Sequence, residues 1–153
     1  MPWTSTVPAA ISGLVQAFSA ADGMSGVKVL DGPAIASQAA LKVLAVGWTS
    51  VMGEVAVEAQ SAPDGLGGNR SEEEYTVRCA IAVLAGSTGV SAARKTAYGI
   101  FSAACAALGQ DQRLGGAVVR AYVGGHSLVP EQVSAGVQMT LAFEVNVEAF
   151  TSR

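Results

Sequence analysis

The chain contains one long segment, Ser134 to Phe150, in which apolar and polar residues alternate. The apolar residues at every second position are Val137, Met139, Leu141, Phe143, Val145 and Val147. Successive side chains of a strand point to opposite faces of a sheet, whereas a helix would not separate these residues in this way. The segment therefore predicts a central antiparallel strand. We expect a helix to cover one of its faces and the other to meet solvent or a partner.

Two further segments alternate and predict a hairpin. Glu54 to Ser61 alternates through Val55, Val57 and Ala59, and Glu72 to Leu84 follows after a glycine-rich connection. The apolar face of the second segment consists of Tyr75, Val77, Cys79, Ile81 and Val83. We interpret the pair as a long antiparallel hairpin whose flexible tip spans about residues 62–71.

Helical spacing marks two other regions. Residues 6–21 place Thr6 at a capping position and Pro8 in the first turn, with a stripe formed by Ile11, Leu14, Val15 and Phe18. A second helix is predicted to be capped by Thr88 or Ser91 and to end at Gly109. Its expected buried face comprises Ala93, Ala97, Ile100, Phe101, Ala104, Cys105 and Leu108. Arg94, Lys95 and Ser102 face away.

Shorter segments complete the predicted sheet. The expected strands are Val27 to Leu30, Leu41 to Trp48, Ala117 to Val123 and His126 to Val129, with His126 in a turn after two glycines. The fold class that follows is α+β. It has an antiparallel or mixed β-sheet with a long hairpin, packed by two main helices on one face. The length predicts a single domain over residues 1–153.

Charge is scarce in this sequence. Hydrophobic residues make up 50% and charged residues 14%, against about 25% charged in a typical soluble domain. Such a chain either lies in a membrane or buries much of its surface in an assembly. The uncharged run from Met1 to Ala21 lacks a basic start, and Ser12, Gly13 and Gln16 interrupt it. It therefore fits neither a signal peptide nor a membrane span, and we expect a cytosolic protein made for assembly.

The net charge argues against a protein that grips nucleic acid. Nine Lys and Arg residues against twelve Asp and Glu residues give 9 − 12 = −3. No basic block is present, so the electrostatic attraction that drives binding to phosphates is missing.

Residues with catalytic or metal-binding chemistry are few and isolated. His126 is the only histidine, and neither HExxH nor CxxC occurs. Cys79 and Cys105 are interpreted as buried free thiols. Gly65 to Gly68 lacks the pattern of a phosphate-binding loop, and Glu72 to Glu74 is interpreted as a solvated strand entrance. We therefore expect no enzyme activity, no metal and no cofactor.

The order of these segments resembles a known family. The phrases that carry the likeness are VKVLDGP, SEEEYTVRCAIAVLAGS, VSAARKTAYGIFSAACAAL and AVVRAYVGGHSLVPEQVSAGVQMTLAFEVNVEAF. Together they are similar to the tail terminator, or tail completion, proteins of long-tailed bacteriophages, especially phages of actinobacteria. The likeness covers nearly the whole chain.

This resemblance implies a structural virion protein with no active site. Such a protein forms a ring, expected to be a hexamer, that caps the tail tube and stops its polymerisation. Its implied partners are further copies of itself, the tail tube protein and the head-completion or connector proteins. DNA would pass through the channel without sequence-specific binding, and the acidic balance suits that passage. The implied location is the tail or neck of the virion, assembled in the host cytoplasm without a membrane.

The function of such a protein lies in its surfaces. The candidate interface residues are Trp3, Asp64, Leu66, Asn69, Arg70, Arg94, Lys95 and Arg113. Trp3 stands in an uncharged leading arm and is the expected aromatic anchor. Leu66 and Arg70 can anchor the hairpin tip, one through apolar contact and the other through charge.

Two alternatives stay open. Another neck or tail-tube component, such as a head–tail connector, would share this composition. A small oligomeric α+β enzyme with a site between subunits is the alternative from a different class.

Overall fold

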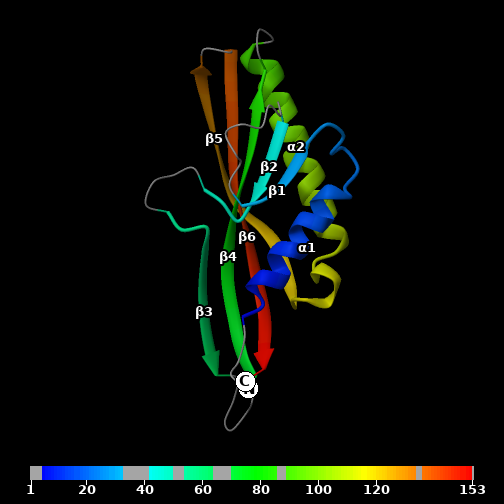
Figure 1. Ribbon diagram of the computed structural model, residues 1–153, viewed down its shortest axis with the longest axis vertical. Helices are drawn as coiled ribbons and strands as arrows, with labels where there is room; N and C mark the ends of the chain where they lie inside the picture. The colour runs from blue at the N-terminus through cyan, green and yellow to red at the C-terminus, as the bar shows by residue number, and fades with distance from the viewer. Residues whose placement is uncertain are drawn as a thin grey trace.

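The computed structural model describes residues 5–32, 42–49, 54–63, 70–85, 89–133 and 136–152. In this part of the chain, two helices pack on one face of a six-stranded mixed sheet (Figure 1), so the predicted α+β class is confirmed. The helices are α1 Val7–Ser19 and α2 Val90–Gln110, followed by the short 3-10 helix η1 Leu114–Gly116. The strands are β1 Lys28–Asp31, β2 Lys42–Val46, β3 Val57–Pro63, β4 Arg70–Leu84, β5 Arg120–Val133 and β6 Gly136–Ser152.

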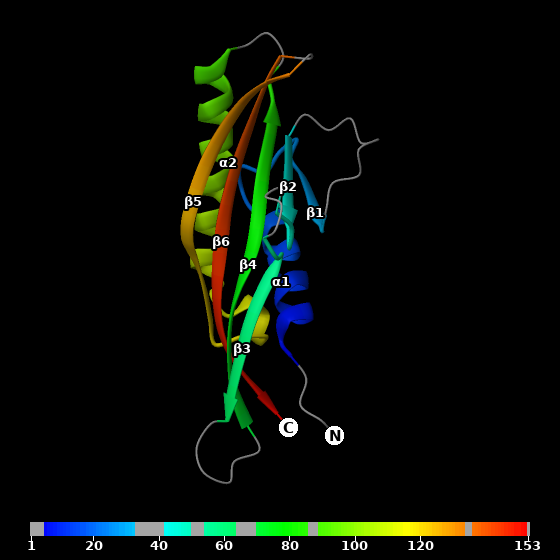
Figure 2. The same cartoon turned by 90° about the vertical axis from the view of Figure 1, so that its left-hand side faces the viewer.

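The sheet is organised around the antiparallel pair β4–β6. Its order is β1-β2-β4-β6-β5, with β3 also paired to β4, and only β1 and β2 run parallel. One edge of β4 is shared by two strands: β2 pairs along Cys79 to Val83 and β3 along Ser71 to Val77. Figure 2 looks onto the face of the sheet that the helices leave open, with α1 and α2 behind the strands. The predicted central strand and the pairing of the predicted hairpin are both confirmed. The predicted tip over residues 62–71 is wrong at its ends, because Ala62 pairs with Glu72 and Pro63 with Ser71 in the ladder.

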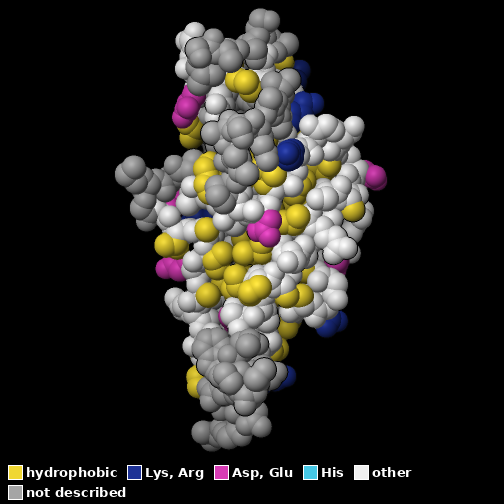
Figure 3. Space-filling model, in the orientation of Figure 1, with side chains coloured by type: hydrophobic (Ala, Val, Ile, Leu, Met, Phe, Trp, Pro, Cys, Tyr) yellow, Lys and Arg dark blue, Asp and Glu magenta, His cyan; other side chains and the backbone are white. Residues whose placement is uncertain are grey.

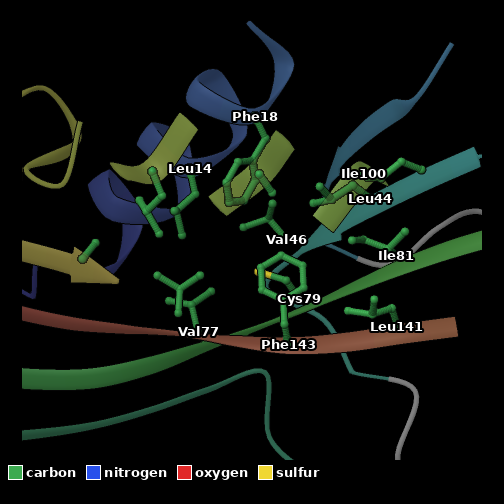
Figure 4. Packing of buried hydrophobic residues seen from close by; sticks show 14 of the residues in the cluster. Leu14, Phe18, Leu44, Val46, Val77, Cys79, Ile81, Ile100, Leu141 and Phe143 are labelled. Carbon is green, nitrogen blue, oxygen red and sulfur yellow. The ribbon is translucent and has the colours of Figure 1, made fainter. Parts of the chain in front are cut away.

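Alternation explains which side of each long strand is buried. The odd-numbered residues of β4 from Ser71 to Val83 and those of β6 from Met139 to Thr151 all face the helices and are buried. Figure 4 shows the centre of this core, where α1 contributes Leu14 and Phe18 and β2 contributes Val46. The Phe143 ring lies 6.3 Å from that of Phe18 and 5.3 Å from that of Phe101 on α2.

The helix ends differ in detail from the prediction. Thr6 occupies the N-cap position of α1, but its side chain makes no capping bond and contacts Glu73 instead. The N-cap of α2 is Gly89, and Ser91 lies inside the helix, so the predicted Ser91 cap is wrong; Thr88 lies outside the described residues. A glycine fits there because the backbone has φ 90°. The helix ends at Gln110, one residue beyond Gly109.

The predicted turn at His126 is wrong, because β5 is one continuous strand. Its register to β6 shifts between Val123 and His126, so the two glycines form an irregularity inside the strand. A Cβ on Gly124 would lie 2.5 Å from Nδ2 of Asn146. The glycine therefore makes room for a side chain of the neighbouring strand.

Among the described residues, no helix is both long enough and apolar enough to cross a membrane.

Two buried acidic groups lead to a prediction about alkaline stability. Burial raises the pKa of the Cys79 thiol from 9.0 to about 12, and burial also raises the pKa of the Tyr75 hydroxyl from 10.0 to about 12. Between these unfolded and folded values the unfolded chain binds fewer protons than the folded chain. The free energy of unfolding should therefore fall as the pH rises from 9.0 towards about 12.

Denaturant unfolding across this pH range measures the effect. Cys79→Ala should lower the free energy of unfolding at neutral pH because it leaves a cavity. It should also remove the part of the fall in stability with pH that is due to the thiol and that begins near its unfolded pKa of 9.0. Cys105, which is half-buried rather than fully buried as predicted, provides the matched variant Cys105→Ala. A Cys79→Ala protein that loses stability with pH as steeply as the parent would contradict the assignment.

Candidate functional site

The side of the sheet away from the helices, here called the open face, carries most of the polar side chains of the long strands. Its members on β4 and β6 are Glu72, Glu74, Thr76, Arg78, Glu144, Asn146, Glu148 and Phe150. The flanking strands add Glu58 and Gln60 from β3 and Arg120 and Tyr122 from β5. Because neither described helix covers it, this face is where the described part of the sheet meets solvent or a partner.

Strand register brings carboxylates together on the open face. Glu74 on β4 stands directly opposite Glu148 on β6. Like charges in opposite positions of two strands repel each other and destabilise the pair. The next row contains Glu58, opposite Thr76, and Thr76 donates a hydrogen bond to Asn146 Oδ1 at 3.0 Å. Arg120 on β5 stands directly opposite Glu148 on its other side, so these rows hold three carboxylates and one cation, and this part of the open face is acidic overall.

A shallow hollow of about 360 Å³ lies over these rows. Its polar lining consists of Glu58, Gln60, Glu74, Thr76, Tyr122, Asn146 and Glu148. The guanidinium carbon of Arg120 lies 4.4 Å from the centre of the Tyr122 ring, at the β5 margin of the sheet. The hollow has no nucleophile–base pair among these residues, and its chemistry is that of a negatively charged, hydrogen-bonding surface.

Arg78 lies on β4 between the segment that pairs with β2 and the segment that pairs with β3. Its carbonyl oxygen accepts hydrogen bonds from the amides of Gly47 and Trp48, and its own amide donates to Ala56 O at 2.9 Å. Its guanidinium donates to Val55 O at 2.8 Å and lies 3.5 Å from a Glu54 carboxylate oxygen. Arg78 thus holds the two strands in place and is a structural residue of the open face.

Glu73 corrects the interpretation of Glu72 to Glu74 as a solvated entrance. Its side chain faces the helices and is only 2% exposed. The carboxylate accepts hydrogen bonds from the Thr6 amide at 2.8 Å, from Thr6 Oγ1 at 2.7 Å and from Ser5 Oγ. Because the Thr6 hydroxyl proton goes to Glu73, the Tyr75 hydroxyl donates to Thr6 Oγ1 at 2.9 Å.

This arrangement caps α1 from a distance. The amino terminus of a helix carries unpaired N–H groups and a partial positive charge, both of which favour a carboxylate. Here the carboxylate comes from β4 rather than from the helix or its flanking residues. The contact fixes where the chain enters α1.

The four predicted interface residues that the structure describes do not form one patch. Arg70, at the start of β4, has its guanidinium carbon 4.0 Å from the centre of the Phe150 ring. Arg94 and Lys95 are exposed near the start of α2, at the opposite end of the long axis (Figure 1). Arg113 is exposed in the turn after α2. The other four predicted residues, Trp3, Asp64, Leu66 and Asn69, lie outside the described residues.

His126 packs against aromatic side chains of α2. Its Nε2 is 3.2 Å from the Tyr98 hydroxyl, and its ring centre is 4.9 Å from that of Phe101. Within the described ranges, no three His, Cys, Asp or Glu side chains are grouped so that they could hold a metal ion.

One face of the molecule carries a band of hydrophobic side chains. Figure 3 shows this band across the middle of the face that carries α1 and β3, with an acidic side chain within it and other charged side chains mainly towards the margins. Val55, next to β3, is 50% exposed, and Val57 and Ile11 are half-buried. A band of this kind is typical of a surface that another protein covers.

Sequence reasoning did not identify the acidic hollow. The alternation of carboxylates along β4 and β6 is visible in the sequence, but it does not show which residues stand opposite each other. Only the register places Glu74 beside Glu148 and Glu58 beside Thr76.

Comparison with known proteins gives a likeness of fold. No protein-family model matches the sequence, and no curated protein sequence matches it either. Among solved structures, a chain in "Virion of native gene transfer agent (GTA) particle" superimposes with a TM-score of 0.51 at 16% sequence identity. The match covers 95% of this chain and 98% of that chain. At this identity the match shows a shared fold.

Proposed function

We propose that this protein is a structural component of a phage-like virion, and specifically a tail terminator. Copies of the chain assemble into a closed ring, expected to be a hexamer, that caps the tail tube and stops its growth. The ring then presents a surface to the head-completion or connector proteins. In this proposal the protein is not an enzyme and needs no cofactor.

The observation that carries the proposal is the end-to-end match to a virion chain. The shared fold extends over 95% of this chain and 98% of the other, so the likeness includes both helices and all the strands of the sheet rather than one part of the fold. The sequence resemblance to tail terminators, which extends over nearly the whole chain, agrees with it. The low content of charged residues, 14%, is what a subunit with two covered flanks requires.

The acidic open face suits the lining of a DNA channel. A ring that places the helices outside turns the open face inwards, with Glu58, Glu74 and Glu148 towards the lumen. Carboxylates repel the phosphate backbone, so DNA would pass without binding. In this arrangement the repulsion between Glu74 and Glu148 destabilises the subunit, but the two carboxylates keep the channel lining acidic.

Polymerisation of the cognate tube protein tests the proposal. Purified tube protein is allowed to elongate with and without this protein, and tube length is measured by electron microscopy. A terminator should shorten the tubes at substoichiometric concentration because one ring suffices for each growing end. Unchanged tube lengths at saturating protein would refute the assignment.

The same experiment separates the alternatives. A tube subunit would add to the tubes along their length or polymerise on its own. A connector would leave tube growth unchanged and bind head-completion proteins. An oligomeric enzyme would retain a reproducible small molecule, which native mass spectrometry of the purified oligomer would detect.

A further inference from the structure

The sheet has two exposed edges whose strand directions complement each other. Along the part of the sheet that contains β3, the order is β3-β4-β6-β5, and every neighbouring pair is antiparallel. The strands therefore alternate down, up, down, up. A second copy placed in the same orientation beside β5 would present its β3, again running down, so the antiparallel alternation would continue without interruption.

The outer edge of β3 is ready to accept a strand. Arg78 N–H donates to Ala56 O. In the register that follows, Glu58, Gln60 and Ala62 occupy the positions whose backbone groups point towards β4. Because hydrogen-bonded positions alternate along an antiparallel strand, the backbone groups of Val57, Ala59 and Ser61 point outwards. Pro63 falls on an outward position, where its missing N–H costs no bond to β4. Every residue from Glu58 to Pro63 is exposed.

The outer edge of β5 is closed at one end and open beyond it. The Ala121 N–H points away from β6 and donates to Gln112 O at 2.7 Å. From Val123 to Gln132, no backbone hydrogen bond outside the β5–β6 ladder occurs within the described part of the chain. The open stretch is longer than β3, which has seven residues. This open stretch lies further along the strand direction than β3 does. To pair β3 of one copy with it, neighbouring copies must be shifted relative to each other along the strands, as also happens when a sheet closes into a barrel.

Apolar surface and weak edge protection favour the same pairing. Glu58 is the one charged residue of β3. The β3 edge also adjoins the hydrophobic band of Figure 3. Apart from Pro63 at its last residue, β3 has no lysine and one charge, so its edge from Val57 to Ser61 has little of the usual protection against edge pairing.

From these observations we infer that the outer edge of β3 is an interaction surface for a second copy of this chain, which it binds through the open edge of β5. The contact is heterologous, since different surfaces of the two copies meet, and its repetition generates a ring when the rotation between copies closes. This inference rests on the proposed function and specifies how its ring is held together.

Cross-linking of assembled rings tests the pairing. Gln60→Cys and Val129→Cys place thiols on the open face of the two edges, in a Cys105→Ser background that leaves only the buried Cys79. A short bis-maleimide should give the double variant a ladder of covalent multimers up to the ring. Each single variant should give none, as should the pair Gln60→Cys with Ser102→Cys, which lies on the exposed side of α2.

Three other outcomes would each contradict a different part of this reasoning. Dimers from Gln60→Cys alone would show that β3 pairs with itself across a two-fold axis and would overturn the inference. Rings visible by electron microscopy without a ladder in the double variant would overturn it while leaving the proposed function standing. If no preparation forms rings even with tube protein present, both the inference and the proposed function are refuted.

A proline variant provides an independent measurement. Ala59→Pro removes an outward N–H but no bond to β4, so the subunit should keep its circular dichroism spectrum. Ring formation should then require at least a tenfold higher protein concentration. Ser61→Ala keeps the N–H and should assemble normally. Normal rings from a folded Ala59→Pro protein would contradict the pairing. If that variant is unfolded, the cross-linking result decides.

Discussion

Replacement of Phe143 by alanine is expected to lower the free energy of unfolding by about 3–5 kcal/mol, the usual cost of removing a buried aromatic ring. Phe143 is 2% exposed and lies in the middle of β6, the strand between β4 and β5. Its ring contacts Phe18 of α1 and Phe101 of α2, so one truncation weakens the packing of both helices on the sheet. Denaturant unfolding followed by circular dichroism measures the loss.

The same strand supplies a matched control. Phe150 is 40% exposed on the open face and contacts Arg70. Loss of one exposed cation–π contact costs about 0.5–1 kcal/mol. Phe150→Ala should therefore change stability far less than Phe143→Ala, and equal losses from the two substitutions would mean that the core is not centred on β6.

Replacement of Glu73 by alanine is the second large effect. The change removes the acceptor of three hydrogen bonds, so the amide and hydroxyl protons of the half-buried Thr6 lose their acceptor, while the Tyr75 hydroxyl stays in contact with Thr6 Oγ1. Hydrogen bonds to a charged group contribute about 1.5–3 kcal/mol each. Because exposed Ser5 can turn to water, we expect a total loss of about 2–4 kcal/mol. Amide exchange at Thr6 should accelerate, since its N–H bonds directly to the lost carboxylate.

Two substitutions at and beside this position distinguish the explanation from a general effect of charge. Glu73→Gln keeps an acceptor oxygen and should recover part of the lost stability. Glu74→Ala lies on the open face opposite Glu148, so it should leave stability unchanged or raise it slightly by relieving repulsion. A Glu74→Ala protein as unstable as Glu73→Ala would contradict the different burial of these two neighbours.

The long strands and both helices could be predicted because their patterns are local. Alternation in β4 and β6 identifies the buried residues from Tyr75 to Val83 and from Met139 to Val147. The stripe of α1 likewise identifies Leu14 and Phe18 as core residues. These signals depend only on the period of each element and on the hydrophobicity of its side chains.

Features that depend on distant partners could not be predicted. Glu73 has the appearance of a solvated carboxylate until Ser5 and Thr6, 68 and 67 positions away, supply their donors. Gly124 and Gly125 suggest a turn, whereas the side chain of Asn146 requires a glycine within a continuous strand. The acidic hollow similarly arises from the register between four strands.

Electron microscopy of tail tubes incubated with the purified protein is the decisive test of the terminator function. We expect one closed ring at a single end of each tube, with the sheets lining the channel, the helices outside and no further growth beyond the ring. Incorporation of the protein along the whole tube, or tubes that keep growing with bare ends at saturating protein, would contradict it.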